Sequence, residues 1–107
     1  MAVVLNYLMY WHGRMLRQRP KLDPAGGVPK VQLLQYHTAK QIRRGIAGAY
    51  CINYIRYAVR GLERLGYIEV HKNPWRPGDR TRHFYVTPEA FLAVQKTRKE
   101  LLEGVRL

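Results

Sequence analysis

Gly66 separates two segments whose apolar residues repeat with different periods. Before this glycine, apolar side chains recur at helical steps of three and four, at Ile52, Ile55, Val59, Leu62 and Leu65. A glycine just past such a repeat supplies the left-handed conformation that ends many helices. After it the period becomes two, because Ile68 and Val70 alternate with polar or tyrosine neighbours. We therefore expect a helix that starts near residue 50 and passes directly into a strand.

A return strand is predicted shortly after the first one. A period of two appears again in residues 81–86, where Arg82, Phe84 and Val86 alternate with Thr81, His83 and Tyr85. Between the two strands, residues 73–79 contain two prolines and a glycine. Such a connection is too long and too rich in proline for a tight two-residue turn. We therefore expect a β-hairpin over residues 67–87 with an extended tip.

Thr38 and Gln41 precede an apolar repeat at the spacing of a capping box. In that motif the threonine hydroxyl accepts the backbone amide of the glutamine, whose side chain reaches back to the threonine amide. A short helix with Ile42 and Ile46 facing inward should follow and end near Gly48. Two helices joined by a few small residues are typical of a helix-turn-helix, which we place at residues 38–65.

Helices are also expected at both ends of the chain. Residues 1–17 carry an apolar stripe at helical spacing, formed by Val4, Tyr7, Leu8, Trp11 and Met15. Residues 20–29 are rich in proline and glycine and predict a loop, and the apolar run 31–34 is expected to be a short strand. Thr87, Pro88 and Glu89 suit the start of a last helix over residues 88–104. We therefore expect one α+β domain, mostly α, over residues 1–107.

Charge gives the strongest indication of a partner. Nineteen basic residues against seven acidic ones give a net charge of +12. The excess is uneven, since residues 31–66 hold six basic and one acidic residue, whereas residues 88–107 hold four and three. A chain of this charge repels itself, so the charge usually persists because the partner is a polyanion. Nucleic acid is the predicted partner, and a merely solvated basic surface is the alternative.

The sequence offers no pattern typical of catalysis or metal binding. The acidic residues are scattered, the four histidines lack metal-ligand spacing, and the lone Cys51 cannot complete a zinc site. We expect Cys51 to be a small buried hydrophobe and the chain to be no enzyme, with no cofactor and no metal. Residues 1–9 are too short to span a bilayer and lack the features of a signal peptide. A cytoplasmic protein without membrane contact is therefore expected.

Two stretches resemble a known superfamily. Residues 57–68, YAVRGLERLGYI, resemble the end of the recognition helix and the first wing strand of the MarR, PadR and ArsR-like transcription regulators. Residues 79–90, DRTRHFYVTPEA, resemble their wing, second strand and closing helix. The short single closing helix departs from the MarR pattern, so the resemblance is to the superfamily. It implies a winged helix-turn-helix, with the N-terminal and C-terminal helices flanking it, in a transcription regulator that binds specific double-stranded DNA.

The helix that follows the turn would then be the recognition helix, lying in the major groove. Its polar face carries Tyr50, Asn53, Tyr54, Arg56, Tyr57 and Arg60. Arginine can bond guanine and asparagine can bond adenine through two hydrogen bonds each, while tyrosines suit phosphates, sugars and thymine methyl groups. The alternative for the tyrosines is that they cover the core or a dimer interface.

Basic residues of two further segments are predicted to contact DNA. The wing carries Lys72, Arg76, Arg80 and Arg82, which we expect on the phosphate backbone or in the minor groove. The first helix of the motif carries Lys40, Arg43 and Arg44, which we expect on the backbone, with a solvated helix face as the alternative. We expect Trp75 to stiffen the wing tip or to pack beneath it, and direct contact with DNA is the less favoured interpretation.

The outer helices hold more large apolar residues than one small core requires, which predicts a homodimer. The expected interface residues are Tyr7, Trp11, Met15, Phe91, Leu92 and Leu101. A monomer that folds these helices onto its own core is the alternative. For the function, the alternative is an RNA-binding or ribosome-associated winged helix, whose tyrosines would stack on unpaired bases.

Overall fold

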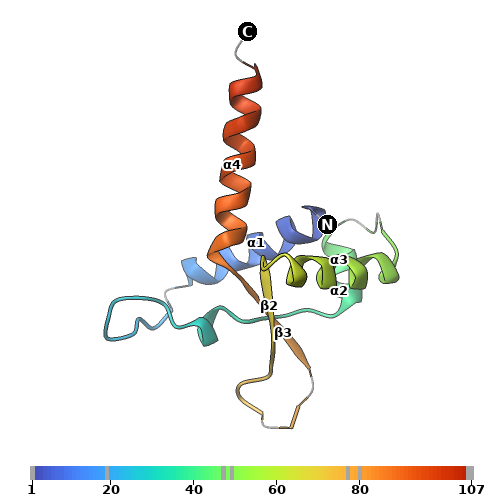
Figure 1. Cartoon of the computed structure of the whole chain (residues 1–107). Coiled ribbons are helices and arrows are strands. Elements are labelled where there is room, and N and C mark those ends of the chain that lie inside the picture. The colour runs from blue at the N-terminus through green and yellow to red at the C-terminus, as the bar shows by residue number, and fades with distance from the viewer. Residues whose placement is uncertain are drawn as a thin grey trace.

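The fold is α+β and mostly helical. The computed structural model describes residues 2–18, 20–46, 48, 50–76, 78–79 and 81–105, except for the side chains of 101, 102, 104 and 105. These residues form four α-helices, one 3₁₀ turn and a three-stranded sheet (Figure 1). The elements are α1 (Ala2–Arg17), η1 (Lys30–Leu33), β1 (Gln35–Tyr36), α2 (Ala39–Gly45), α3 (Ile52–Arg64), β2 (Ile68–Lys72), β3 (Arg82–Val86) and α4 (Pro88–Val105).

The sheet is antiparallel, with strand order β1-β3-β2. The predicted hairpin is present, and its register pairs Ile68 with Val86. The strand expected over residues 31–34 is wrong. That run is the 3₁₀ turn η1, in which the Gln32 N–H donates to the Pro29 carbonyl (3.0 Å). The strand begins only at Gln35, which lies opposite Phe84 on β3.

Both predicted helix-end motifs are formed. Thr38 Oγ1 accepts the Gln41 N–H (3.1 Å), and Gln41 Oε1 accepts the Thr38 N–H (2.9 Å), which completes the capping box of α2. Gly66 adopts φ +76° at the end of α3. Its N–H donates to the Glu63 carbonyl, and the next N–H donates to the Leu62 carbonyl, each at 3.0 Å. This pair of bonds is the Schellman motif, which satisfies carbonyls left free at a helix end.

Thr87 joins the two ends of the hairpin. Its hydroxyl donates to the Gly66 carbonyl (2.6 Å), and its N–H donates to the Tyr67 carbonyl (3.0 Å). Thr87 is 5% exposed. The end of α3, the start of β2, the end of β3 and the start of α4 therefore meet at one buried point.

The buried face of α1 is wider than the predicted stripe. Leu8 is fully buried as expected, but Leu5 and His12 are buried too, while Trp11 and Met15 are only partly buried. The cause is that α1 contacts α2, α3, β1, β3 and η1. A helix packed from several sides buries more than one stripe.

Three positions at and within α3 differ from the sequence expectation. Cys51 is exposed because it is the N-cap residue of α3 and precedes the packed face. Leu65 is 54% exposed because it is the C-cap residue, where the chain leaves the helix. Ala58, which the predicted stripe passed over, is fully buried.

The helix α4 stands out from the rest of the molecule, as Figure 1 shows, and the extents are 55 × 40 × 24 Å. Its first turns are packed: Ala90 is fully buried, and Phe91 and Val94 lie against the core. Residues 95–100 are exposed. In the described part of the chain, no helix has the length and apolar character that crossing a membrane requires.

Gly45, the last residue of α2, permits a close approach by α1. A Cβ at this position would collide with the ring of Tyr7, which is partly buried. The same ring packs edge-on against His37, with 5.2 Å between centroids. Any larger residue at 45 must displace this ring.

Gly45→Ala is expected to lower the free energy of unfolding by about 1–3 kcal/mol, because overpacking forces side chains off their rotamers. The matched control is Gly13→Ala in α1, where a Cβ meets no atom within 4 Å. That change should be neutral or should stabilise by up to about 1 kcal/mol. Urea unfolding of both variants tests this. In a Tyr7→Ala background Gly45→Ala should cost little, and an undiminished cost there would contradict the explanation.

His12 is a buried polar residue of the core. Its ring centroid lies 5.1 Å from that of Phe91 on α4 and 6.1 Å from that of Tyr85 on β3. Its Nδ1 atom has no hydrogen-bond partner among the described residues. Burial lowers the pKa of His12, and burial likewise lowers the pKa of His37. The folded state therefore favours the neutral form of both rings.

Stability should consequently fall as the pH falls below about 6.5, since the unfolded chain then binds protons that the folded chain resists. Each histidine contributes at most about 1.4 kcal/mol per pH unit, and the contribution levels off below the folded pKa. His12→Leu should reduce the loss of unfolding free energy between pH 7.5 and 5. Urea unfolding at a series of pH values measures it. An unchanged pH slope in this variant would show that His12 binds protons equally in the folded and unfolded chains, which would contradict the prediction.

Candidate nucleic-acid interface

The exposed face of α3 carries the residues predicted for it. Ile55, Val59 and Leu62 bury the opposite face. The exposed side chains are therefore held on one side of a packed helix. They include Asn53, Arg56, Tyr57 and Arg60, and the last turn adds Glu63 and Arg64. Tyr57 is 67% exposed. The structure brings these four predicted residues together.

The two tyrosines nearest the start of α3 are arranged differently. Tyr50 and Tyr54 stack on each other, with ring centroids 4.5 Å apart and an angle of 21° between the planes. Both are partly buried, and Tyr54 packs against the core. Their rings are thus largely engaged within the chain.

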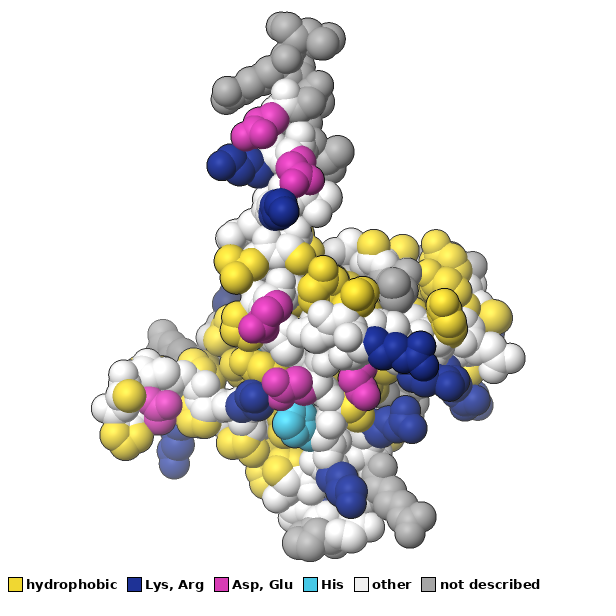
Figure 2. Space-filling model, in the orientation of Figure 1, with side chains coloured by type: hydrophobic (Ala, Val, Ile, Leu, Met, Phe, Trp, Pro, Cys, Tyr) yellow, Lys and Arg dark blue, Asp and Glu magenta, His cyan; other side chains and the backbone are white. Residues whose placement is uncertain are grey.

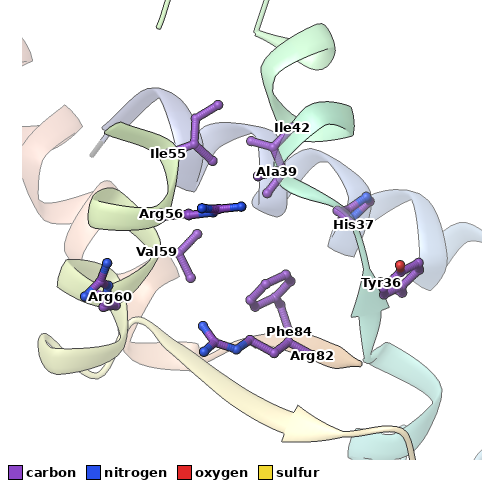
Figure 3. A pocket seen from close by; sticks show the side chains of 10 residues that line it. All are labelled: Tyr36, His37, Ala39, Ile42, Ile55, Arg56, Val59, Arg60, Arg82 and Phe84. Atoms are coloured by element: carbon purple, nitrogen blue, oxygen red, sulfur yellow. The ribbon is translucent and has the colours of Figure 1, made fainter. Parts of the chain in front are cut away.

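A groove of about 570 Å³ lies between α2, α3, β1 and β3. Its floor is apolar, with Ile42, Ile55 and Phe84 buried beneath it. Figure 3 shows Arg56 pointing from α3 into this groove and Arg82 extending from β3 towards α3, with Arg60 further along α3. The groove therefore joins the predicted recognition helix to the predicted wing.

Sequence reasoning missed three residues of this groove, Tyr36, His37 and Phe84. Phe84 could have been predicted, because the alternating pattern puts it on the same strand face as Arg82. No sequence pattern indicated Tyr36 and His37, since β1 is only two residues long. Their position depends on the pairing of β1 with β3, which the local sequence does not encode.

Among the described residues, no carboxylate lies within ion-pair distance of the arginines around the groove. In the described residues, ion pairs within 4.0 Å are those of Glu69 with Lys30 and with His71, both at 2.9 Å. The Lys30 ammonium is the main cause that lowers the pKa of Glu69. Residues 38–62 contain five basic residues and no acidic one. Unpaired guanidinium groups on two walls of a groove favour an anion between them.

A second basic surface lies on α2. Lys40, Arg43 and Arg44 are exposed and line a shallow hollow next to Gly48 and Ile52, at the start of α3. The Gly48 N–H donates to the Arg43 carbonyl (2.8 Å). This surface continues the basic side of α3.

The tip of the hairpin is organised by two polar side chains. Asn73 Nδ2 donates to Asp79 Oδ2 (3.0 Å), and Asp79 Oδ1 accepts the Thr81 N–H (2.9 Å) and the Thr81 hydroxyl. The Thr81 hydroxyl, with the other donors, lowers the pKa of Asp79 to about 2. Lys72 and Arg76 are exposed beside this network. Arg80 lies outside the described residues.

The residues predicted for a dimer interface are distributed differently. Tyr7 is engaged within the chain by Gly45 and His37, and Phe91 lies against His12. Trp11 and Met15 are partly buried. Leu92 on α4 is 64% exposed, and the side chain of Leu101 lies outside the described residues.

Basic side chains are concentrated on one part of the surface. In Figure 2, Lys and Arg side chains gather on the side of the body where α2 and α3 lie, whereas the acidic side chains in view are spread over α4, the body and a loop, and one of them borders the basic group. The segment Pro88–Val105 carries three basic and three acidic residues. The basic surface is therefore separate from the projecting helix.

Comparison of the chain with protein-family models, with curated proteins and with solved structures found no match. Among the described residues, no three His, Cys, Asp or Glu side chains lie together as a metal site. The assignment of a function therefore depends on the geometry and charge of the residues above.

Proposed function

We propose that the chain is a winged-helix protein that binds specific sequences of double-stranded DNA as a homodimer and regulates transcription. The observation that carries the proposal is the groove between α3 and the sheet. Arg56, Arg60 and Arg82 surround it without a carboxylate partner in the described residues. The order of helices and strands, with a hairpin directly after the second helix of a helix-turn-helix, is compatible with that fold.

In this proposal α3 lies in the major groove, which is wide enough to admit one helix. The hairpin then reaches the neighbouring backbone or minor groove. The sugar-phosphate strand between the two DNA grooves would cross the protein groove, where Arg60 and Arg82 meet it from opposite walls. Lys40, Arg43 and Arg44 would contact phosphates on the other side of α3.

Base recognition is assigned to the start of α3. Asn53 and Arg56 lie in its first two turns and are exposed. Asparagine and arginine are the side chains that most often bond adenine and guanine edges through two hydrogen bonds. Tyr57, beside them, has an exposed ring that suits a sugar or a thymine methyl group.

RNA is the second candidate partner, and one observation disfavours it. Recognition of unpaired bases needs aromatic rings that are free to stack on them. Two of the three tyrosines predicted for this face, Tyr50 and Tyr54, are partly buried and stack on each other, whereas Tyr57 keeps an exposed ring. A basic helix face beside a basic hairpin is better matched to the spacing of grooves in a duplex.

The test is binding of a fluorescently labelled duplex, measured by anisotropy over a range of salt concentrations. Contact with about five phosphates should give a slope of about −4 to −5 in a plot of log K against log salt. Unlabelled duplex should displace the probe at lower concentration than a structured RNA of equal length. Stronger competition by the RNA, or binding that salt leaves unchanged, would overturn the proposal.

Arg56→Ala is expected to weaken binding to a duplex selected from a random pool by about 1–3 kcal/mol, with less effect on a scrambled duplex. Arg82→Ala should weaken both equally and reduce the salt slope by about one. Arg98→Ala on α4 is the control, since it removes the same charge from a distant exposed site. Anisotropy titrations with both duplexes measure these effects. An equal loss for both duplexes in Arg56→Ala would show that this residue does not read bases.

We place the homodimer interface on α4. This helix projects from the body, carries no net charge over Pro88–Val105 and exposes Leu92. Two copies of a chain with net charge +12 repel each other, so a neutral helix is the element on which they can meet. A two-fold axis there would give a pseudo-palindromic DNA site with half-sites about one helical turn apart.

Leu92→Asp is therefore expected to convert the dimer into a monomer, because it puts a charge into an apolar contact. Analytical ultracentrifugation measures the change in mass. Thr97→Asp is the control, because it adds the same charge at an exposed residue on another face of the same helix. On DNA that flanks its own gene, wild type should protect two segments a turn apart, and Leu92→Asp should protect them more weakly. Wild type that sediments as a monomer at all concentrations would refute the dimer.

A further inference from the structure

The side chain of Trp75 is unusually exposed for its type. It is 63% exposed at the tip of the hairpin, whereas the other tryptophan, Trp11, is partly buried beneath the guanidinium of Arg14. Tryptophan is a large apolar side chain, and its exposure forgoes the free energy that burial would supply. The expectation that Trp75 packs beneath the tip is therefore wrong.

The backbone of Trp75 is held by the tip network. Its N–H donates to Asn73 Oδ1 (2.9 Å), and the amide of the same asparagine donates to Asp79 on the other side of the tip (3.0 Å). Asp79 is fixed in turn by Thr81. The polar network thus fixes the backbone position from which the Trp75 side chain projects.

The Trp75 ring packs against one neighbouring side chain. The indole of Trp75 lies edge-on to His83, with 6.1 Å between centroids and an angle of 62°. His83 is buried and packs on Tyr36, with 5.6 Å between centroids. The ring is thus supported on its inner side and open to solvent elsewhere.

The surroundings of the ring are basic. Lys72 and Arg76, close to Trp75 in the sequence, are exposed, and the carboxylate of Asp79 accepts hydrogen bonds from Asn73 and Thr81. Positive charge near the ring disfavours a purely apolar partner. It favours a polyanion that also offers apolar surface to the ring. The minor groove of DNA has phosphates at its rims and sugars and base edges inside.

We propose that Trp75 is an aromatic wedge that enters the minor groove next to the major-groove segment contacted by α3. This proposal rests on the DNA-binding function proposed above. Apolar side chains inserted there unstack a base step and bend the duplex, which is easiest at pyrimidine–purine steps. The indole N–H can donate to the acceptors on the floor of the minor groove.

The first experiment uses Trp11→Phe, which leaves Trp75 as the only tryptophan of the chain. A labelled duplex reports binding by anisotropy while tryptophan emission and its quenching by acrylamide report on Trp75. Bound duplex should quench the emission and lower the acrylamide quenching constant by about twofold or more. Full binding with both signals unchanged would overturn the wedge and leave the DNA-binding proposal intact. No binding of any duplex would overturn the DNA-binding proposal itself.

The second experiment compares substitutions at position 75. Trp75→Ala should weaken duplex binding by about tenfold, and Trp75→Phe should keep most of the affinity. Energy transfer between dyes at the two duplex ends should show a bend with wild type that Trp75→Ala loses. Leu22→Ala, an apolar residue with 64% exposure in another loop, is the control and should change neither. Equal affinity and bending for wild type and Trp75→Ala would contradict the inference.

An anionic lipid surface is the competing partner for an exposed tryptophan among basic residues. Vesicles of phosphatidylcholine with phosphatidylserine test it in the Trp11→Phe variant. They should leave the Trp75 emission unchanged at salt concentrations where the duplex quenches it. A response to vesicles but not to bound duplex would assign the residue to a membrane and refute the wedge.

Discussion

The arrangement of the whole molecule depends on the hydrogen bonds of Thr87 to the chain just after α3. The hydroxyl and the N–H of this residue close the hairpin onto the carbonyls of Gly66 and Tyr67. The left-handed Gly66 is what turns the chain from helix into strand at that point. Because the direction of α3 and that of the hairpin are both set there, the groove between them and its three arginines depend on this junction. This junction thus positions the two walls that carry the arginines, while α2, β1 and His37 between them complete the groove.

Electrostatics acts against the folded state in the same region. Three arginines share one groove, and the described residues place no carboxylate within ion-pair distance of them. Like charges held together destabilise a compact chain, and the apolar floor formed by Ile42, Ile55 and Phe84 offsets part of this cost. A bound anion would reduce the repulsion and so stabilise the fold, by a free energy that grows with the logarithm of its concentration once this exceeds the dissociation constant.

Local patterns predicted the parts of the fold that local physics controls. The capping box at Thr38, the left-handed Gly66 and the hairpin follow from nearest neighbours, and all three are present. The burial of His12 and the strand β1 depend on partners far along the chain, so periodicity did not find them. The polar face of α3 was predicted because burial of one helix face exposes the other. The groove was not predicted, because its existence depends on the distance between α3 and β3, which the sequence pattern does not give.

The projecting helix α4 has a mechanical consequence. It contains 18 residues, which correspond to a length of about 27 Å at 1.5 Å per residue. Since packing against the core involves its first turns, a tilt of about 5° at its base would move its far end by about 2 Å. In two copies joined through such helices, the distance between the two bodies would depend on how Ala90 and Phe91 pack against the core. Small changes in core packing, even those distant from any nucleic acid, would then alter the spacing between two binding surfaces.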